Sequence, residues 1–316
     1  MITKDRLPFG YVTACYAGDK FMVGATLASM RHFSPEVPIC LIADGDVDVS
    51  DLQQEYDLIV LRIDELPSEE MREMIGGSYR AKLAAMWEGP FEHYVWMDSD
   101  AIVWGDISKS VRTDLDFQIF WDDISIPADA EEVPTWLAHY YFNLDKLKNF
   151  DPDFEWRGHP YFSAGVYACR RNVITYEQWK ECEMWGQKAP DMFKFGDQGI
   201  LNYLVLANSQ RGEIRTSRTD LQWVRSRDNG DIKRDCARSS WRFPSQVSCP
   251  MILHFCGRKP FTFNFRSFCR PFTIARLEHH RRKHNNLTAW QLVLTEDGRT
   301  LFVKMIGKIK RLMSGK

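Results

Sequence analysis

The stretch that decides the fold is Tyr94-Val95-Trp96-Met97-Asp98-Ser99-Asp100, which continues into Ala101-Ile102-Val103-Trp104. Apolar and aromatic residues flank a short acidic segment, and their β-branched and aromatic character indicates a buried strand rather than a helix. Residues two apart in an extended chain point to the same side, so the carboxylates of Asp98 and Asp100 can face one ion. Such oxygen ligands suit Mn²⁺ or Mg²⁺, which keep positions open for substrate phosphates.

Two other interpretations of the acidic segment stay open. An Asp-x-Asp segment after a strand is often only a turn that caps the next helix. A phosphatase of the haloacid dehalogenase type also has Asp-x-Asp after an apolar strand, with Asp98 then the nucleophile and Asp100 the acid or base. That motif usually opens its domain, whereas here an α/β pattern over residues 9–88 precedes it.

The composition is that of an ordinary soluble globular protein. The 316 residues are 44% hydrophobic and 27% charged, enough for one large domain or two with a substantial core. The net charge of −2 gives no field that favours nucleic acid, and no nucleic-acid partner is expected. We find no signal-peptide pattern and no apolar run near the roughly 18 residues of a membrane span. The eight cysteines show no CxxC pair, which favours reduced thiols and a cytoplasmic location.

The chain alternates between strand and helix patterns, which is typical of a mostly parallel sheet with crossover helices. A helix is expected within each connection and a buried strand on either side of it. The expected elements are strands at 9–16, 37–43, 58–63, 94–104, 117–121, 161–169 and 251–255, and helices at 21–30, 78–88, 173–185 and from 197 onward.

Two segments depart from this rhythm. Residues 125–160 are rich in Pro, Asp and aromatic residues, which fits either an acceptor-side lid or a surface excursion with its own aromatic cluster. From Phe302 onward, apolar residues at 302, 305, 306, 309, 312 and 313 fall on one helical face. The opposite side carries Lys304, Lys308, Lys310 and Arg311, and the segment has no acid. A basic amphipathic helix of this kind, residues 302–316, can dock on an anionic membrane surface, although a terminal helix can also pack on its own domain.

Four segments occur in a fixed order along the chain: the strand with Asp98-Ser99-Asp100, then 162–166 (FSAGV), 196–202 (GDQGILN) and 254–260 (HFCGRKP). Together they resemble glycosyltransferase family 8, whose members are retaining enzymes with the A-type nucleotide-sugar fold. The resemblance covers about residues 9–262, including the opening strand with Thr13 and the helix with Lys82. It implies an α/β fold with a single Rossmann-like nucleotide-sugar transferase domain.

The resemblance also implies a role for particular residues. Metal ligands would be Asp98, Asp100 and His254, with Mn²⁺ as the ion and Mg²⁺ as the alternative. The sugar at the reacting face would meet Asp197 and Gln198. The remaining donor contacts would be Thr13, Lys82, Ser99, Ser163, Gly257 and Lys259, with Ser99 near the nucleoside, Lys82 near the donor phosphate or sugar, and Gly257 and Lys259 at the diphosphate.

Simpler interpretations of single residues stay open beside these roles. A lone histidine in an apolar strand, such as His254, is usually a satisfied core group, and Asp197 can be a helix N-cap. Two positions also depart from the family's pattern: Ser163 stands where the family usually has Asn, and one residue instead of two separates Gly257 from Lys259.

The expected protein is therefore a metal-dependent, retaining hexosyltransferase. It would move a hexose from a UDP-sugar to a glycan or lipid-linked acceptor, in the cytoplasm and peripherally on the inner membrane face. Residues 1–270 would form the catalytic domain, with 125–160 as an acceptor-side insertion and 271–316 as a basic helical extension. Besides the phosphatase, a protein of this fold that binds a nucleotide sugar or glycan without turnover stays open as an alternative.

Overall fold

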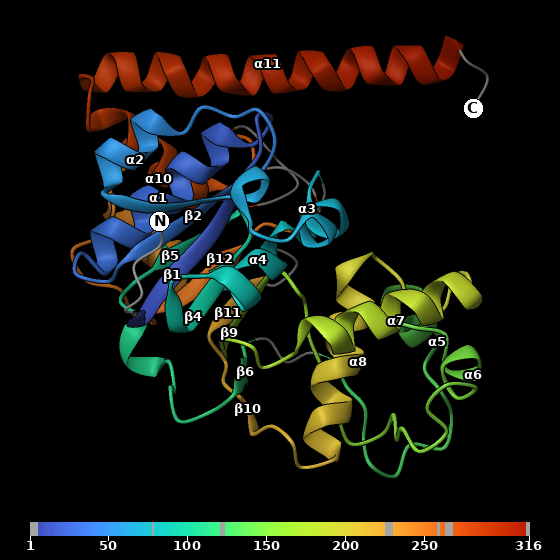
Figure 1. Ribbon diagram of the computed structural model, residues 1–316. Coiled ribbons are helices and arrows are strands. Elements are labelled where there is room, and N and C mark those ends of the chain that lie inside the picture. Colours follow the sequence, from blue (N-terminus) through green and yellow to red (C-terminus); the bar gives the residue numbers. More distant parts are fainter. Residues whose placement is uncertain are drawn as a thin grey trace.

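The computed structural model describes residues 6–77, 79–120, 124–224, 230–257, 260–262 and 268–313. Its centre is a seven-stranded sheet in the order β10-β6-β9-β4-β1-β2-β3 (Figure 1). All neighbours in it are parallel except β9, which is antiparallel to both β4 and β6. The mostly parallel sheet predicted from the sequence is confirmed. The strands are β1 (Leu7–Cys15), β2 (Ile39–Ala43), β3 (Leu58–Arg62), β4 (Phe91–Met97), β6 (Phe117–Ile119), β9 (Val166–Arg170) and β10 (Thr216–Arg218).

Helices cover both faces of this sheet. Because side chains alternate along a strand, β4 sends Tyr94 and Trp96 into one core and Val95 and Met97 into the other. The first core lies under α4 (Leu83–Glu88), α7 (Tyr176–Lys188) and α8 (Asp197–Gln210), and the second under α1 (Lys20–Phe33) and α10 (Arg270–Arg281). The shorter elements are α2 (Ser50–Tyr56), η1 (Ile63–Glu65), α3 (Glu69–Ile75), η2 (Tyr79–Lys82), η3 (Ser108–Ser110) and α9 (Gly230–Arg238).

The long strand expected at 94–104 is broken at its acidic segment. β4 ends at Met97, and β5 (Ala101–Trp104) belongs to a second sheet, in the order β11-β12-β5, with β11 (Gln222–Val224) and β12 (Met251–His254). β5 runs antiparallel to β12, with Ala101 opposite His254. The turn from one sheet to the other therefore places the acidic segment beside the end of β12.

The segment 125–160 is packed rather than loose. β7 (Ile124–Ser125) pairs with β8 (Pro160–Tyr161) at its base, and it contains α5 (Thr135–Tyr140) and α6 (Leu144–Leu147). Several of its aromatic side chains are buried in the core shared with α7 and α8, among them Tyr141, Phe142, Phe154 and Trp156. The interpretation as a surface excursion with a separate aromatic cluster is therefore wrong.

The predicted boundary at 270/271 does not separate two units. α10 begins at Arg270, and its residues Phe272, Ile274 and Ala275 are fully buried in the core that α1 also lines. What extends from the domain is α11 (Asn286–Met313), which lies along the top of the molecule (Figure 1). We therefore correct the start of the extension to this helix.

The two halves of α11 differ in their surroundings. The first half packs on α10 through Ala289 and Val293, and the buried Arg276 of α10 reaches its acidic residues. In the second half Leu301, Phe302, Met305 and Ile306 are exposed. Within the described residues, no helix is both long enough and apolar enough to cross a membrane.

Candidate active site

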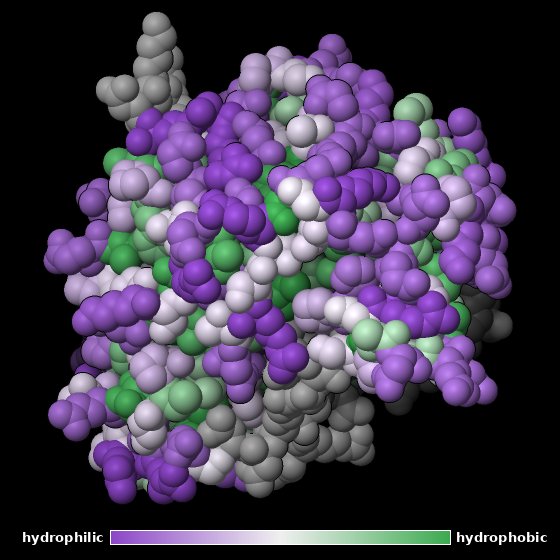
Figure 2. Space-filling model, turned by 90° about the horizontal axis from the view of Figure 1, so that it is seen from below, coloured by the Kyte–Doolittle hydropathy of each residue, from purple (hydrophilic) through white to green (hydrophobic). Residues whose placement is uncertain are grey.

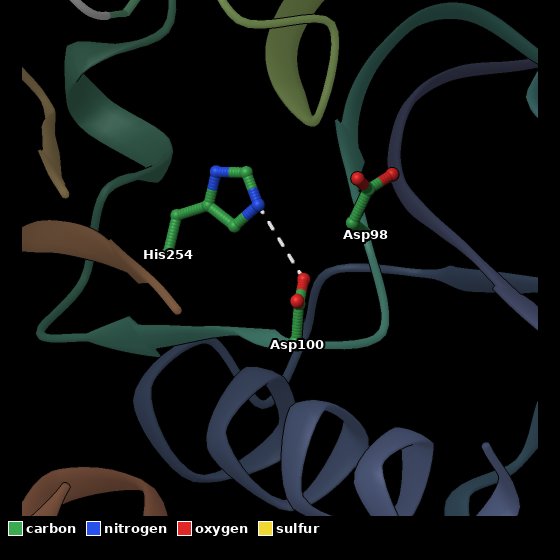
Figure 3. Close-up of side chains that lie close together, drawn as sticks. All are labelled: Asp98, Asp100 and His254. Carbon is green, nitrogen blue, oxygen red and sulfur yellow. Dashed lines mark ion pairs between the residues drawn. The ribbon is translucent and has the colours of Figure 1, made fainter. Parts of the chain in front are cut away.

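Two carboxylates and an imidazole meet at the junction of the two sheets. One ligand atom from each of Asp98, Asp100 and His254 lies within 4.8 Å of the others, and His254 Nε2 is 3.4 Å from Asp100 Oδ1 (Figure 3). Backbone hydrogen bonds to neighbouring segments hold the acidic turn in place. The amide of Asp98 donates to the Gly165 carbonyl, and that of Phe255 donates to the Asp100 carbonyl. The structure thus brings together the three residues predicted as metal ligands.

Gly165 makes room for this cluster. A Cβ atom on Gly165 would lie 2.3 Å from Cε1 of His254 and 2.8 Å from Oδ2 of Asp98, closer than atoms can approach. The small-residue segment before β9 is therefore required by the close approach of its backbone to the imidazole and the carboxylate.

The cluster is chemically suited to a divalent cation. Carboxylate oxygens suit Mn²⁺ and Mg²⁺, and an imidazole ligand favours Mn²⁺ because Mg²⁺ prefers oxygen throughout. His254 is buried, whereas the Asp98 side chain is 35% exposed, so one side of the cluster is accessible from outside. Attraction to Asp100 and Asp98 outweighs the effect of burial and raises the pKa of His254.

Lys82 lies behind the carboxylates and holds them together. Its ammonium is 2.7 Å from Asp197 Oδ2 and 3.5 Å from Asp98 Oδ1, and it donates to the Ala164 carbonyl at 2.9 Å. Burial lowers the pKa of Lys82, but Asp197 and Asp98 outweigh that effect, and the net shift is upward. Burial raises the pKa of Asp197, an effect that Lys82 opposes. The three acceptors fix Lys82 within the site.

Two cavities meet at the carboxylates. The smaller holds about 160 Å³ and is lined by Ala14, Tyr16, Asp19, Trp96 and Ser99 together with Tyr79, Asp98 and Asp100. The larger holds about 670 Å³ and shares those last three residues. A metal held by Asp98 and Asp100 would therefore stand between a small chamber and a large one.

Most of the other predicted site residues line one of the two cavities. Lys82, Ser163, Asp197, Gln198 and Gly257 line the larger cavity, and Ser99 lines the smaller. Ser163 Oγ accepts a hydrogen bond from the Gly165 amide. Lys259 lies outside the described residues.

Thr13 does not reach the cavities. Its side chain is fully buried in β1, and within the part of the chain that the structure describes its hydroxyl has no hydrogen-bond partner. The next residue along the strand, Ala14, lines the smaller cavity. The prediction of a direct donor contact at Thr13 is wrong by one residue, because successive side chains of a strand point to opposite faces.

Asp197 is the first residue of α8, and no side-chain cap bond precedes it. Its carboxylate is turned to Lys82 instead, so the N-cap interpretation is wrong. Gly196 precedes it with a φ of +61°, and a Cβ there would lie 1.8 Å from the Tyr79 ring. The glycine thus lets Tyr79 cover the backbone next to Asp197.

Sequence reasoning missed several aromatic residues of the site, and four of them stand out. Tyr16 and Tyr79 line the smaller cavity, while Tyr140 and Phe195 stand at the larger one, 43% and 59% exposed. The Tyr140 and Phe195 rings stack with their centroids 5.8 Å apart, and Phe195 has a φ of +48°, which is strained for a bulky residue. The signal that could have found Phe195 is its place directly before Gly196-Asp197.

Comparison with solved structures identifies the fold. The galactosyltransferase LgtC, in complex with donor and acceptor sugar analogues, is 16% identical, with a TM-score of 0.52 over 84% of this chain and 95% of LgtC. The bifunctional glycosyltransferase WbbM is 13% identical, with a TM-score of 0.51 over 92% of this chain and 52% of WbbM. The chain has the A-type glycosyltransferase fold. No protein-family profile and no curated protein matches the sequence.

The A-type fold bears on the phosphatase alternative. In that alternative the strand before Asp98 would open the domain, but β4 pairs in the centre of the sheet with β1 and β9, after three earlier strands. The similar structures are glycosyltransferases. The resemblance seen in the sequence is therefore confirmed at the level of the fold.

Proposed function

We propose that this protein is a metal-dependent hexosyltransferase, which moves a hexose from a UDP-sugar to a glycan or lipid-linked acceptor with retention of configuration. The observation that carries the proposal is the meeting of two cavities at Asp98 and Asp100. A nucleotide sugar has a nucleoside at one end, a sugar at the other and a diphosphate between them. A metal at the junction would touch the diphosphate while each end occupies its own cavity.

The residues present fit the divalent cation that this reaction needs. Asp98, Asp100 and His254 would hold Mn²⁺, or Mg²⁺ in its place. The bound ion would neutralise the charge that develops on the departing diphosphate. Ser99 and the ring of Tyr16 would meet the nucleoside, and the choice of uridine rests on the family 8 resemblance.

On the sugar side, Asp197 and Gln198 would lie against the transferred hexose. Asp197 is paired with Lys82, so it keeps a fixed negative charge that would stabilise positive charge at the anomeric carbon, rather than serve as a free base. Gln198 donates to the Tyr140 carbonyl at 3.1 Å, which links the sugar side to the segment 125–160. The proposal of retention rests on the family 8 resemblance.

The acceptor would enter past the stacked pair of Tyr140 and Phe195. Aromatic faces pack well against the apolar face of a sugar ring, and both rings are exposed at the larger cavity. These features support a glycan acceptor, including one carried on a lipid.

We test the donor and metal first. UDP release from a panel of UDP-sugars is measured with Mn²⁺ for the wild type, Asp100→Ala and His254→Ala. We expect slow hydrolysis of one donor, lost in both variants. If UDP release survives the substitution His254→Ala, His254 is not a ligand of the metal. If calorimetry shows metal-dependent UDP binding but no UDP is released from any donor, even with glycan acceptors present, the binding-only alternative is favoured. If calorimetry shows no UDP binding, the transferase proposal is overturned.

We further propose that the second half of α11 docks on the anionic cytoplasmic face of a membrane. Its apolar side chains Leu301, Phe302, Met305 and Ile306 are exposed, and the sequence around them supplies Lys304, Lys308, Lys310 and Arg311 without an acid. The face of the molecule in Figure 2, in contrast, is mostly hydrophilic with scattered hydrophobic spots.

Vesicle sedimentation tests this docking. The wild type should bind vesicles with anionic lipid and release them at high salt, and the double substitution Phe302→Ser and Met305→Ser should weaken binding. Leu287→Ser is the matched control, since Leu287 is 70% exposed at the other end of the same helix. Equal binding to neutral vesicles would contradict the electrostatic part of the proposal.

A further inference from the structure

A buried glutamine lies behind His254. Gln222 is on β11, which pairs with β12 so that Gln222 lies opposite Ile252 and Val224 opposite His254. Only 3% of Gln222 and 2% of His254 are exposed. The amide nitrogen of Gln222 is 2.8 Å from Nδ1 of His254, while Nε2 of the same ring faces Asp100. The two ring nitrogens therefore have different partners, one an amide and the other a carboxylate.

This arrangement fixes the tautomer of a neutral ring. An amide nitrogen can only donate, so Nδ1 must accept and the ring proton must reside on Nε2. Nε2 with a proton can donate toward Asp100 but has no lone pair for a metal. A ligating Nε2 requires the proton on Nδ1, and Nδ1 then requires an acceptor.

Gln222 can supply that acceptor without a change in the backbone. Its Oε1 is buried and has no hydrogen-bond partner among the described residues, which is unusual for a carbonyl oxygen. The two ends of an amide have almost the same size and shape. A rotation of the terminal amide by half a turn would place Oε1 beside Nδ1 of His254. There Oε1 would accept a hydrogen bond from Nδ1–H.

We propose that Gln222 is a positioning residue that sets which nitrogen of His254 carries the proton. Without metal, its amide nitrogen donates to Nδ1. With metal at Nε2, its oxygen accepts from Nδ1–H. One proton leaves Nε2 to water and one is taken up by Nδ1, so the ring stays neutral. The inference rests on the proposed function, because it assumes a cation at Asp98, Asp100 and His254.

Binding of Mn²⁺ alone, followed by electron paramagnetic resonance without nucleotide, tests the inference apart from activity. Gln222→Met keeps the length of the side chain but removes donor and acceptor, and it should weaken Mn²⁺ binding about 10- to 100-fold. Gln222→Glu keeps an acceptor and loses the donor, so it should bind Mn²⁺ at least as tightly as the wild type.

The matched control is Gln118→Met in β6. Gln118 is similarly buried, at 1% exposure. Its amide nitrogen donates to the Ser110 carbonyl and the Thr219 hydroxyl, not to a residue of the metal cluster. This variant should lose stability but keep the Mn²⁺ affinity of the wild type. A spectroscopic readout supports the titration, since ¹⁵N shifts of His254 should report the Nε2–H form in metal-free wild type and the Nδ1–H form in Gln222→Glu.

The outcomes separate this inference from the proposed function. If Gln222→Met binds Mn²⁺ within about twofold of the wild type, or Gln222→Glu binds as weakly as Gln222→Met, the role of Gln222 is overturned and the transferase stands. If the wild type itself binds no Mn²⁺, the proposed metal site fails, and the inference with it.

Discussion

The ammonium of Lys82 lies 2.7 Å from the carboxylate of Asp197, and both side chains are buried. This pair connects η2 to the start of α8, two segments far apart in the sequence. Because the same ammonium also reaches Asp98, the pair joins the sugar side of the site to the metal side.

Removing the ammonium group of Lys82 should destabilise the whole domain. Lys82→Met leaves Asp197 buried without its partner, and we expect a loss of about 3–5 kcal/mol in the free energy of unfolding, measured by urea denaturation. The double variant Lys82→Met with Asp197→Leu should recover part of it, since no lone charge stays buried. A loss below about 1 kcal/mol for Lys82→Met would show that the carboxylate finds another partner.

Gly165→Ala should distort the metal cluster and weaken Mn²⁺ binding. The added Cβ would overlap the His254 ring and the Asp98 carboxylate, so we expect at least tenfold (about 1.4 kcal/mol) weaker Mn²⁺ binding by electron paramagnetic resonance. Gly186→Ala in α7 is the control, because among the described residues a Cβ there meets only Phe193, at 3.9 Å. Unchanged Mn²⁺ affinity in Gly165→Ala would mean that a metal does not need His254.

His279 should make the protein sensitive to acid. Burial lowers its pKa to about 4, and its Nδ1 lies 2.7 Å from the Tyr56 hydroxyl. The folded state favours the neutral ring over the charged one. The resulting contribution of His279 to the free energy of unfolding is therefore complete above pH 6.5 and is lost as the pH falls toward 4. It amounts to up to about 3 kcal/mol. Urea unfolding of His279→Gln should show a smaller decrease between pH 7 and pH 4.5, and an identical decrease would assign the acid sensitivity elsewhere.

Arg276 should hold the first half of α11 on the domain. It is fully buried and contacts Asp297 at 2.6 Å, Glu296 at 2.7 Å and the Val293 carbonyl at 2.8 Å. Arg276→Leu removes the buried cation and leaves Glu296 only with His280 and Asp297 only with the Thr262 amide among the described residues. We expect a cost of about 3–5 kcal/mol in the free energy of unfolding. Hydrogen exchange should show faster exchange in residues 286–300, and unchanged protection there would contradict this role.

The aromatic pair should affect acceptor use more than donor use. Phe195→Ala removes the exposed ring that stacks on Tyr140, so we expect a higher KM for the acceptor with little change in acceptor-free UDP release. Phe150→Ala, which removes a partly buried ring that stacks on Trp185 against the hydrophobic core, is the comparison for lost packing alone. If Phe195→Ala lowers sugar transfer to the acceptor and acceptor-free UDP release equally, Phe195 acts on the donor side instead.

The sequence by itself determined the α/β fold, the pair of carboxylates at Asp98 and Asp100 and the basic character of the last segment. These are local signals, because strand and helix periodicity and the spacing of two carboxylates need no knowledge of distant segments. The order of the motifs also led to the A-type fold that the similar structures share.

Only the tertiary structure decided which residues meet. Gln222 and His254 lie 32 positions apart, and Lys82 and Asp197 lie on different elements, so no spacing in the sequence joins them. The side to which Thr13 points, the burial of α10 and the break between β4 and β5 depend on how two sheets pack. Pairing between sheets and packing of helices are long-range contacts, and a single sequence carries no local pattern that specifies them.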